Sequence, residues 1–307
     1  ERNVFHCLAN AAELIHLLNT FDIAGIPILP YKGIVLAASV YNDLAARPAG
    51  DLDLLIHSKH LAQATALLLE RGYRQIGSFQ ADGIPIAFDN HEYVFERPSD
   101  GLVVELRWKL DFIYGRFRRN LDMDWACANR RTAVVAGFEV PDMAPETTLL
   151  VLCMHGSKHV WSRLIWVCDV AQLIASSPQL DWQLTMRVAR QSGLWRALAL
   201  GTLLAHRVAG ARVPGDVLRR LRTVASACRL AEHFEQHLLD QPGIGPVGLV
   251  PYNIQMLDFS DRFSPRLWLG FLRPNDRDRA AFPLPKSLRA LHYLLRPFRL
   301  LFSQPQK

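Results

Sequence analysis

The stretch YKGIVLAASVYNDLAARPAGDLDLLIH, residues 31–57, decides how the first half of the chain folds. Its last part, residues 51–56, begins with alternating acidic and aliphatic residues and ends in an apolar run. This alternation predicts a β-strand, and because successive side chains of a strand point to opposite faces, Asp51 and Asp53 share one face. Two carboxylates this close repel each other unless a cation lies between them. Mg²⁺ prefers such oxygen ligands and often adds substrate phosphates, although a D-x-D pair also occurs by chance in many chains.

A second feature, Lys32-Gly33, lies between a short apolar run at residues 28–31 and a helix-like run at residues 34–41. A strand followed by a helix N-terminus offers backbone N–H groups and the positive end of a dipole to a phosphate. Arg47-Pro48 lies in the loop before Asp51, where Pro48 favours an extended Arg47. We expect Arg47 either to contact a triphosphate or to pair with Asp51 or Asp53.

A β-hairpin is predicted further on, with strands at residues 91–97 and 102–108 and a turn at Pro98-Ser99-Asp100-Gly101. Glu105 lies inside its otherwise aliphatic second strand, and burying an unpaired carboxylate is costly. Glu105 therefore binds a metal ion or forms a salt bridge with Arg107 or Lys109. The strand period places Arg107 on the same face, from which it could also reach a phosphate.

Together these motifs resemble the nucleotidyltransferase superfamily of the DNA polymerase β type. The chain is most similar to an uncharacterised bacterial branch in which Lys-Gly replaces the usual Gly-Ser. The similarity covers residues 10–175, and the matching positions are Lys32, Gly33, Tyr41, Arg47, Pro48, Gly50, Asp51, Asp53, Gly72, Tyr73, 104–108, His155, His159, Trp161, Leu164 and Asp169.

The resemblance implies metal-dependent transfer of a nucleoside monophosphate from an NTP to an acceptor, with release of pyrophosphate. Asp51 and Asp53 would hold Mg²⁺ or Mn²⁺, and Glu105 would join the catalytic ion and help deprotonate the acceptor. The nucleotide-binding residues would be Lys32, Gly33, Arg47 and Arg107. A catalytically silent module that binds nucleotide or a partner through the same fold is the alternative from another class.

The expected fold class is α+β, with two domains. Residues 1–142 would form the nucleotidyltransferase domain, a small mixed sheet with helices on one side. Residues 143–307 would form an all-helical substrate-binding domain with a basic C-terminal segment. The Pro- and Asp-containing stretch at 141–146 suggests this boundary, since Pro145-Glu146 is a favourable helix start. We further expect one strand at residues 132–140 with Gly137 at its turn-like end, a turn or hairpin loop at 80–90 and one helix at 217–241.

His155 and His159 are four residues apart and would share a helix face, with Asp169 following. Three interpretations compete: a metal site, contact with nucleotide or substrate, or a purely structural pair packed against Trp161 and hydrogen-bonded to Asp169. No acidic residue within the same turn completes a known zinc motif, and the resemblance supports contact with nucleotide or substrate. The residues 286–302 mix Arg with Leu, Tyr and Phe, which indicates a docked helix or a basic surface helix that touches membrane or nucleic acid.

The composition of the chain limits which classes of substrate and which cellular setting are expected. The net charge of +6 divides into −5 for residues 1–150 and +11 for residues 151–307, which suggests an anionic substrate or simply an arginine-rich helical surface. A third hypothesis, an RNA-modifying nucleotidyltransferase, is supported only by this basic half. No RNA-binding motif is recognisable, so a small-molecule or peptide acceptor is favoured over RNA. Five scattered cysteines indicate a reducing, cytoplasmic setting. No apolar run reaches membrane-spanning length, and Glu1 leaves room for a removed leader.

Overall fold

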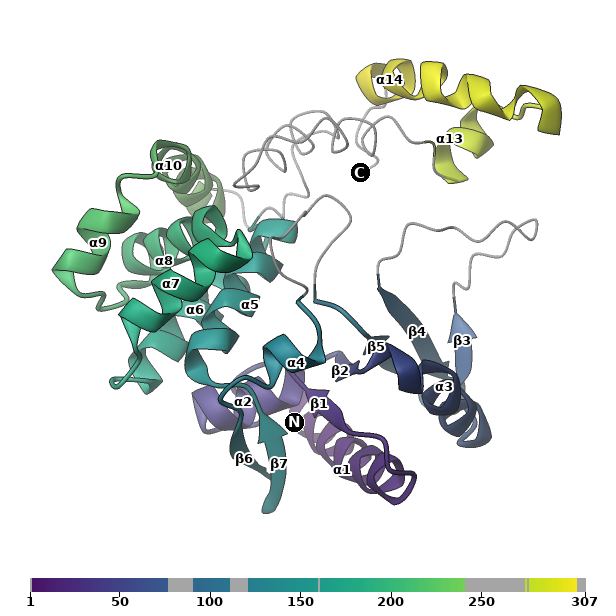
Figure 1. Ribbon diagram of the computed structural model, residues 1–307, viewed down its shortest axis with the longest axis horizontal. Helices are drawn as coiled ribbons and strands as arrows, with labels where there is room; N and C mark the ends of the chain where they lie inside the picture. Colours follow the sequence, from purple (N-terminus) through teal and green to yellow (C-terminus); the bar gives the residue numbers. More distant parts are fainter. Residues whose placement is uncertain are drawn as a thin grey trace. The chain divides into compact units, whose positions relative to one another are not determined.

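The computed structural model describes residues 2–76, 91–110, 121–159, 161–240, 274 and 276–302 (Figure 1). Contacts between Cα atoms group the chain into two compact units. The described residues of the first unit lie within 1–112, 117–152 and 172–185, and those of the second lie within 153–171 and 186–307. The domain boundary between residues 142 and 143 stays a prediction, as does the loop expected at 80–90, which lies outside the described residues.

The first unit contains a mixed five-stranded sheet, which confirms the α+β fold class. Its strand order is β1-β2-β5-β4-β3, and the pairs are antiparallel except for the parallel pair β2–β5. The strands are β1 (Ile28–Pro30), β2 (Asp51–Ile56), β3 (Arg74–Ile76), β4 (Glu92–Arg97) and β5 (Leu102–Arg107).

One face of this sheet is covered by helices and the other carries the acidic residues. On β5, Val104 and Leu106 are fully buried, whereas Val103 and Glu105 are only partly buried. The buried face packs into a core with α1 (Arg2–Ile23), α2 (Gly33–Tyr41) and α3 (Leu61–Glu70), which contribute residues such as Leu14, Phe21, Ile34, Ala64 and Leu68. Burial of these apolar side chains drives the sheet and helices together and leaves the acidic face outside the core.

The single strand expected at residues 132–140 is wrong, because the chain reverses within it. The structure has an antiparallel hairpin there, β6 (Arg131–Val135) and β7 (Phe138–Asp142). Ala136 and Gly137 both have positive φ, 49° and 87°, as the two central residues of a tight hairpin turn require. Gly137 is typical of such a turn, but Ala136 gives no sequence signal for a positive φ. The predicted strand was therefore continued through both turn residues.

The rest of the described chain is helical. Short segments are α4 (Met123–Ala126), η1 (Ser58–His60) and η2 (Lys286–Leu291). The longer ones are α5 (Pro145–Lys158), α6 (Leu164–Ser176), α7 (Trp182–Ser192), α8 (Trp195–Ala209), α9 (Gly215–Leu221), α10 (Ala225–Asp240), α13 (Asp276–Ala281) and α14 (His292–Phe302). Among the described helices, none is both long enough and apolar enough to cross a membrane.

The expected single helix at 217–241 is also wrong, since α9 and α10 are separate. Thr223 interrupts the helix: its hydroxyl donates to the carbonyl of Arg220 at 2.7 Å. The amides of Thr223 and Val224 then bond three residues back, to Arg220 and Leu221, rather than four. Side-chain competition for a backbone carbonyl and a tightened last turn are known ways in which a helix ends.

Glu13 connects α1 to strand β4 and to the segment between α3 and β3. Its carboxylate pairs with Arg97 of β4 at 2.7 Å and with Arg71 at 3.4 Å, and it accepts a hydrogen bond from the Tyr73 hydroxyl at 3.0 Å. Burial alone would raise the pKa of Glu13, but the hydrogen bonds from Arg97 and Tyr73 outweigh it and hold the pKa below its ordinary value of 4.5. The ionised carboxylate therefore stabilises the fold.

We predict that Glu13→Gln lowers the free energy of unfolding by about 2 kcal/mol at neutral pH, because charged hydrogen bonds contribute about 1.5–3 kcal/mol. Chemical denaturation would measure the loss. Because the folded-state pKa is depressed, the advantage of the wild type is fully present above the ordinary value of 4.5 and shrinks as pH falls below it. The exposed Glu70→Gln is the control and should change little. A difference that grows on acidification would contradict this account.

Candidate active site

The register of β2 and β5 brings the three predicted carboxylates onto one face. Asp53 lies directly opposite Glu105, and Asp51 lies opposite Val103. Neighbouring strands are about 4.8 Å apart, and residues in register on parallel strands point to the same side. The sequence-predicted set of Asp51, Asp53 and Glu105 is therefore a contiguous acidic patch at the centre of the sheet.

Electrostatics within this patch are unfavourable for three free carboxylates. Burial raises the pKa of Asp51, and the neighbouring negative charge of Asp53 raises it further. Lys32 and Arg47 act in the opposite direction. A site in which one carboxylate raises the pKa of another is a site that favours a positive ion.

Lys32 supplies such a charge in the structure. Its Nζ lies 2.8 Å from Asp53 Oδ1, and the two side chains are only 12% and 2% exposed. Asp53 Oδ1 nevertheless accepts no hydrogen bond of good geometry from any described residue. We regard the contact as a close charge pair that leaves lone pairs of Asp53 unused, because distance decides the Coulomb attraction whereas angle decides the hydrogen bond.

The backbone at Lys32-Gly33 is unusual in both residues. Lys32 has φ 56° and ψ −146°, a region that is almost reserved for glycine, and Gly33 has φ 41°. A Cβ on Gly33 would lie 3.2 Å from the carbonyl oxygen of Asp51, so the turn presses directly against β2. The amide of Tyr31 also donates to the carbonyl of Asp53 at 3.1 Å. The turn is thus held against the acidic strand, with the N-terminus of α2 beside it.

Arg47 is buried, with 8% of its surface exposed, and braces this turn. Its Nη1 lies 3.4 Å from the carbonyl oxygens of both Gly33 and Pro48. Asn10 of α1 anchors the same loop by donating to the carbonyl of Ala49 at 2.7 Å. Arg47 therefore lies near the acidic patch, in a position to support the Lys32-Gly33 turn.

Arg107 pairs with carboxylates on two strands. Its Nη2 lies 3.1 Å from Glu105 Oε2, and it also forms an ion pair with Glu92, its cross-strand partner on β4. The salt bridge between Glu105 and Arg107, which was the alternative to metal binding, is thus present. The second partner of Arg107, Glu92, was not predicted. The described residues contain no group of three or more His, Cys, Asp or Glu side chains arranged around a common metal position. Instead, the ammonium group of Lys32 contacts the Asp53 carboxylate, and the guanidinium group of Arg107 contacts the Glu105 carboxylate.

Tyr31 is a further residue of the site, and its sequence context predicts no role for it. Its side chain is 5% exposed, and Lys32 Nζ lies 5.2 Å from its ring centroid. Burial raises the pKa of Tyr31 strongly; Arg107 opposes this, and the carboxylates of Asp53, Glu105 and Asp51 add to it. Its hydroxyl therefore stays protonated and can donate a hydrogen bond at the acidic patch.

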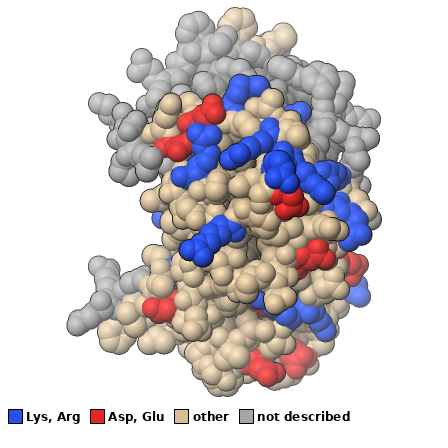
Figure 2. All heavy atoms as spheres, turned by 90° about the vertical axis from the view of Figure 1, so that its left-hand side faces the viewer, with Lys and Arg blue, Asp and Glu red and all other residues tan. Residues whose placement is uncertain are grey.

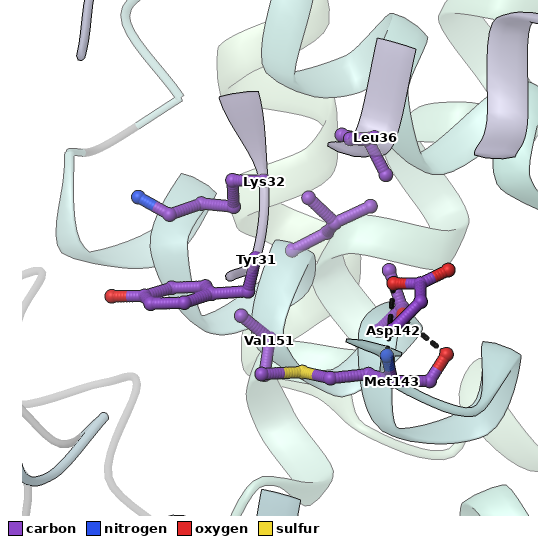
Figure 3. Close-up of a pocket in the computed structure, with 8 residues that line it drawn as sticks. Tyr31, Lys32, Leu36, Asp142, Met143 and Val151 are labelled. Atoms are coloured by element: carbon purple, nitrogen blue, oxygen red, sulfur yellow. Dashed lines mark hydrogen bonds between the residues drawn. The ribbon is translucent and has the colours of Figure 1, made fainter. Parts of the chain in front are cut away.

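A small pocket borders this site within the first unit. Figure 3 shows Tyr31 and Lys32 extending together to one side of it, with Asp142 at the other side. Asp142 accepts hydrogen bonds from the Met143 amide at 2.8 Å and from Arg131 Nε at 2.9 Å. The remaining lining residues are Leu36, Met143, Thr148, Val151 and Leu152.

His155, His159 and Asp169 belong to the second unit. The two imidazole centroids are 4.6 Å apart, and both rings contact Trp166, at 5.6 and 5.1 Å. The indole beside them is therefore that of Trp166. Trp161, the residue expected there, is fully buried against Gly156 and Gly201. Asp169 is 1% exposed, whereas both histidines are partly exposed. Substrate contact by these residues stays a prediction.

An α+β fold with an acidic strand beside a Lys-Gly turn is the arrangement that the sequence analysis associates with nucleotidyl transfer. The sequence profile of a family described as uncharacterised nucleotidyltransferase matches residues 1–210. This match spans more than half of the 307 residues, so the chain belongs to that family and is a nucleotidyltransferase. The resemblance inferred from the sequence is confirmed.

Two solved structures match the chain at low identity. The crystal structure of ANT(2'')-Ia in complex with adenylyl-2''-tobramycin is 13% identical, with 59% of this chain and 97% of that chain covered and a TM-score of 0.44. The solution structure of the antibiotic-resistance factor ANT(2'')-Ia is 11% identical, with 75% and 98% covered and a TM-score of 0.35. No curated protein matches the chain.

The backbone strain at Lys32 can be tested directly by substitution. Lys32→Gly and Lys32→Met both remove the ammonium group beside Asp53, but only glycine suits φ 56° and ψ −146°. Backbone strain of this kind lowers stability by about 1–3 kcal/mol, and glycine relieves it. The greater flexibility of glycine in the unfolded chain takes back about 0.5–1 kcal/mol of this gain. We expect Lys32→Gly to unfold at higher denaturant concentration than Lys32→Met. Equal stability, or a more stable Lys32→Met, would show that Lys32 is unstrained.

Proposed function

We propose that this nucleotidyltransferase moves a nucleoside monophosphate from an NTP to a small-molecule or peptide acceptor, using Mg²⁺ or Mn²⁺ held on the β2–β5 face. The single observation that carries this proposal is the register of the parallel pair, which sets Asp53 opposite Glu105 beside the Lys32-Gly33 turn. A cation site and a phosphate site then lie next to each other, as transfer from a metal-bound NTP requires.

The residues present have the oxygen ligands of a divalent-cation site, which would form once Lys32 and Arg107 leave the carboxylates that they pair with in the structure. Asp53 Oδ1 is buried without a well-formed hydrogen bond from the described residues, and burial together with repulsion from Asp53 raises the pKa of Asp51. The first observation indicates that Asp53 Oδ1 can accept more than its contact with Lys32, and the second indicates excess negative charge around Asp51. Asp51, Asp53 and Glu105 would hold the metal, which when bound neutralises phosphate charge and steadies the attacking and leaving oxygens.

Lys32 has two alternative partners in this proposal. Without nucleotide its ammonium group neutralises Asp53. With nucleotide bound, the ammonium group contacts the β- and γ-phosphates, together with the backbone amide of Gly33 at the start of α2. The Tyr31 ring next to Lys32 limits the directions in which this long side chain can swing.

Arg47 holds the turn in place through the Gly33 carbonyl, and its charge adds to the attraction for phosphate. Arg107 is paired with Glu92 as well as Glu105, so it can release Glu105 and keep a partner. These cationic groups position the triphosphate and balance its charge.

In the transfer step, an acceptor hydroxyl oxygen bonds to the α-phosphorus while the bond from that phosphorus to the bridging oxygen of the β-phosphate breaks. Pyrophosphate leaves with that bonding pair, and the hydroxyl proton passes to the carboxylate of Glu105. Lys32 and Gly33 stabilise the charge that develops on the leaving group.

The experiment that tests this function incubates the full chain with each α-³²P-labelled NTP, Mg²⁺ or Mn²⁺, and separate small-molecule and peptide fractions of a cell extract. We expect pyrophosphate release and transfer of label to one fraction, each dependent on the metal. Label on neither fraction with every NTP would contradict the proposal. Label only on an added RNA fraction would replace the proposed acceptor class.

We predict that Asp53→Asn and Glu105→Gln each lower kcat at least about 100-fold, because each removes a charge that acts on the reacting groups. Initial rates of pyrophosphate release would measure the loss. Glu139→Gln on β7 is the matched control, since Glu139 is exposed and lies in the separate hairpin of the first unit. A loss in the Glu139 variant equal to that in the Asp53 variant would point to damaged folding rather than to the site.

A further inference from the structure

The second unit carries a dense group of arginines around α9. Arg212, Arg219, Arg220, Arg222 and Arg229, here called the α9 arginine cluster, lie within one short stretch of the chain. Asp216 is the sole acidic residue of the sequence between 212 and 229. The local charge is therefore strongly positive, even though the first half of the chain is acidic overall.

The fold of α9 turns this charge outward. Val217, Leu218 and Leu221 are buried on one side of the helix, so Arg219 and Arg220 project from the other. All five arginines of the cluster are exposed. Figure 2 faces the side on which Figure 1 places α7–α10, and Lys and Arg side chains gather on the surface there.

The carboxylates of α10 do not neutralise this cluster. Glu232 and Glu235 of α10 both pair with Arg207 of α8, at 3.4 and 2.6 Å. Within the described part of the chain, none of the five cluster arginines forms an ion pair. Like charges left together repel, and the repulsion is relieved when an anion binds.

Helix electrostatics explain only part of the arrangement. Arg219 and Arg220 lie in the last turn of α9, where a positive charge interacts favourably with the helix dipole. Arg212 precedes the helix, and Arg229 belongs to α10. Their accumulation on the same stretch therefore needs another reason, and an extended anionic partner supplies it.

The surroundings of the cluster favour one kind of partner. The large apolar side chains that are exposed in the described residues all lie outside residues 165–287. The described residues of this stretch therefore present no large exposed apolar side chain that could insert into lipid or form the apolar centre of a protein–protein interface. Binding through charge alone, to regularly spaced phosphates, is how proteins hold a nucleic acid backbone, and the arginine fork fits phosphate oxygens.

We propose that the α9 arginine cluster binds the phosphodiester backbone of a nucleic acid. This inference goes beyond the proposed nucleotidyl transfer and does not depend on it. The cluster makes contacts with phosphates and not with bases, so binding is expected to be insensitive to sequence and strongly dependent on salt.

The test measures fluorescence anisotropy of labelled single-stranded RNA and the matching DNA against the full chain over a series of KCl concentrations. For the wild type, we expect the logarithm of affinity to fall linearly with the logarithm of salt concentration. Arg219→Gln/Arg220→Gln/Arg222→Gln should reduce this slope by about 2, since each single-strand phosphate contact adds about 0.7, and should weaken binding at least about tenfold at ~0.1 M salt.

The control variant, Lys59→Gln/Arg74→Gln/Arg130→Gln, removes the same charge from exposed positions in the first unit and should leave the slope nearly unchanged. Circular dichroism would verify that both triple variants are folded. Equal losses in the two variants would overturn the proposal, because net charge alone would then explain binding. So would the absence of RNA and DNA binding, or binding of phosphatidylserine vesicles through the cluster as tight as that of RNA.

Discussion

The close approach of carboxylates on β2 and β5 is the constraint on which the rest of the first unit depends. Asp51 and Asp53 lie on one strand face, and the register of the parallel pair adds Glu105 beside them. Three such groups at the partly buried centre of a sheet are stable only with positive charge nearby. The protein meets this requirement with Lys32 on Asp53 and with Arg107 on Glu105.

The backbone at Lys32, which supplies one of these positive charges, is strained. Lys32 adopts a conformation suited to glycine, and Gly33 has φ 41° and lies so close to the carbonyl of Asp51 that a Cβ there would be only 3.2 Å from its oxygen. Arg47 and Asn10 hold the surrounding loop through backbone carbonyls. Strain that is maintained by several independent contacts is common at functional sites, where it positions a group before the ligand arrives. Here the positioned group is the Lys32 ammonium, whose second partner in the proposed mechanism is a triphosphate.

Much of this site follows from local sequence, because strand alternation and turn chemistry act over a few residues. The acidic strand, the Lys-Gly turn and the hairpin that carries Glu105 were all predictable in this way. The pairing of Arg107 with Glu92 depends on the register between β4 and β5, and Asn10 reaches Ala49 from 39 residues away. No local pattern encodes such contacts. The hairpin at 131–142 was missed for a different reason, since Ala136 adopts a left-handed conformation that its residue type does not signal.

The most direct test of the central claim, that the β2–β5 face and the Lys32-Gly33 turn form one metal and triphosphate site, is a calorimetric titration. ATP, GTP, CTP and UTP would each be titrated into the wild type and into Asp51→Asn/Asp53→Asn, with and without Mg²⁺. The account predicts that at least one NTP binds the wild type more tightly with Mg²⁺ and that this gain is lost in the double variant. Binding with the same affinity in the presence and absence of Mg²⁺, or an unchanged gain in the double variant, would contradict it.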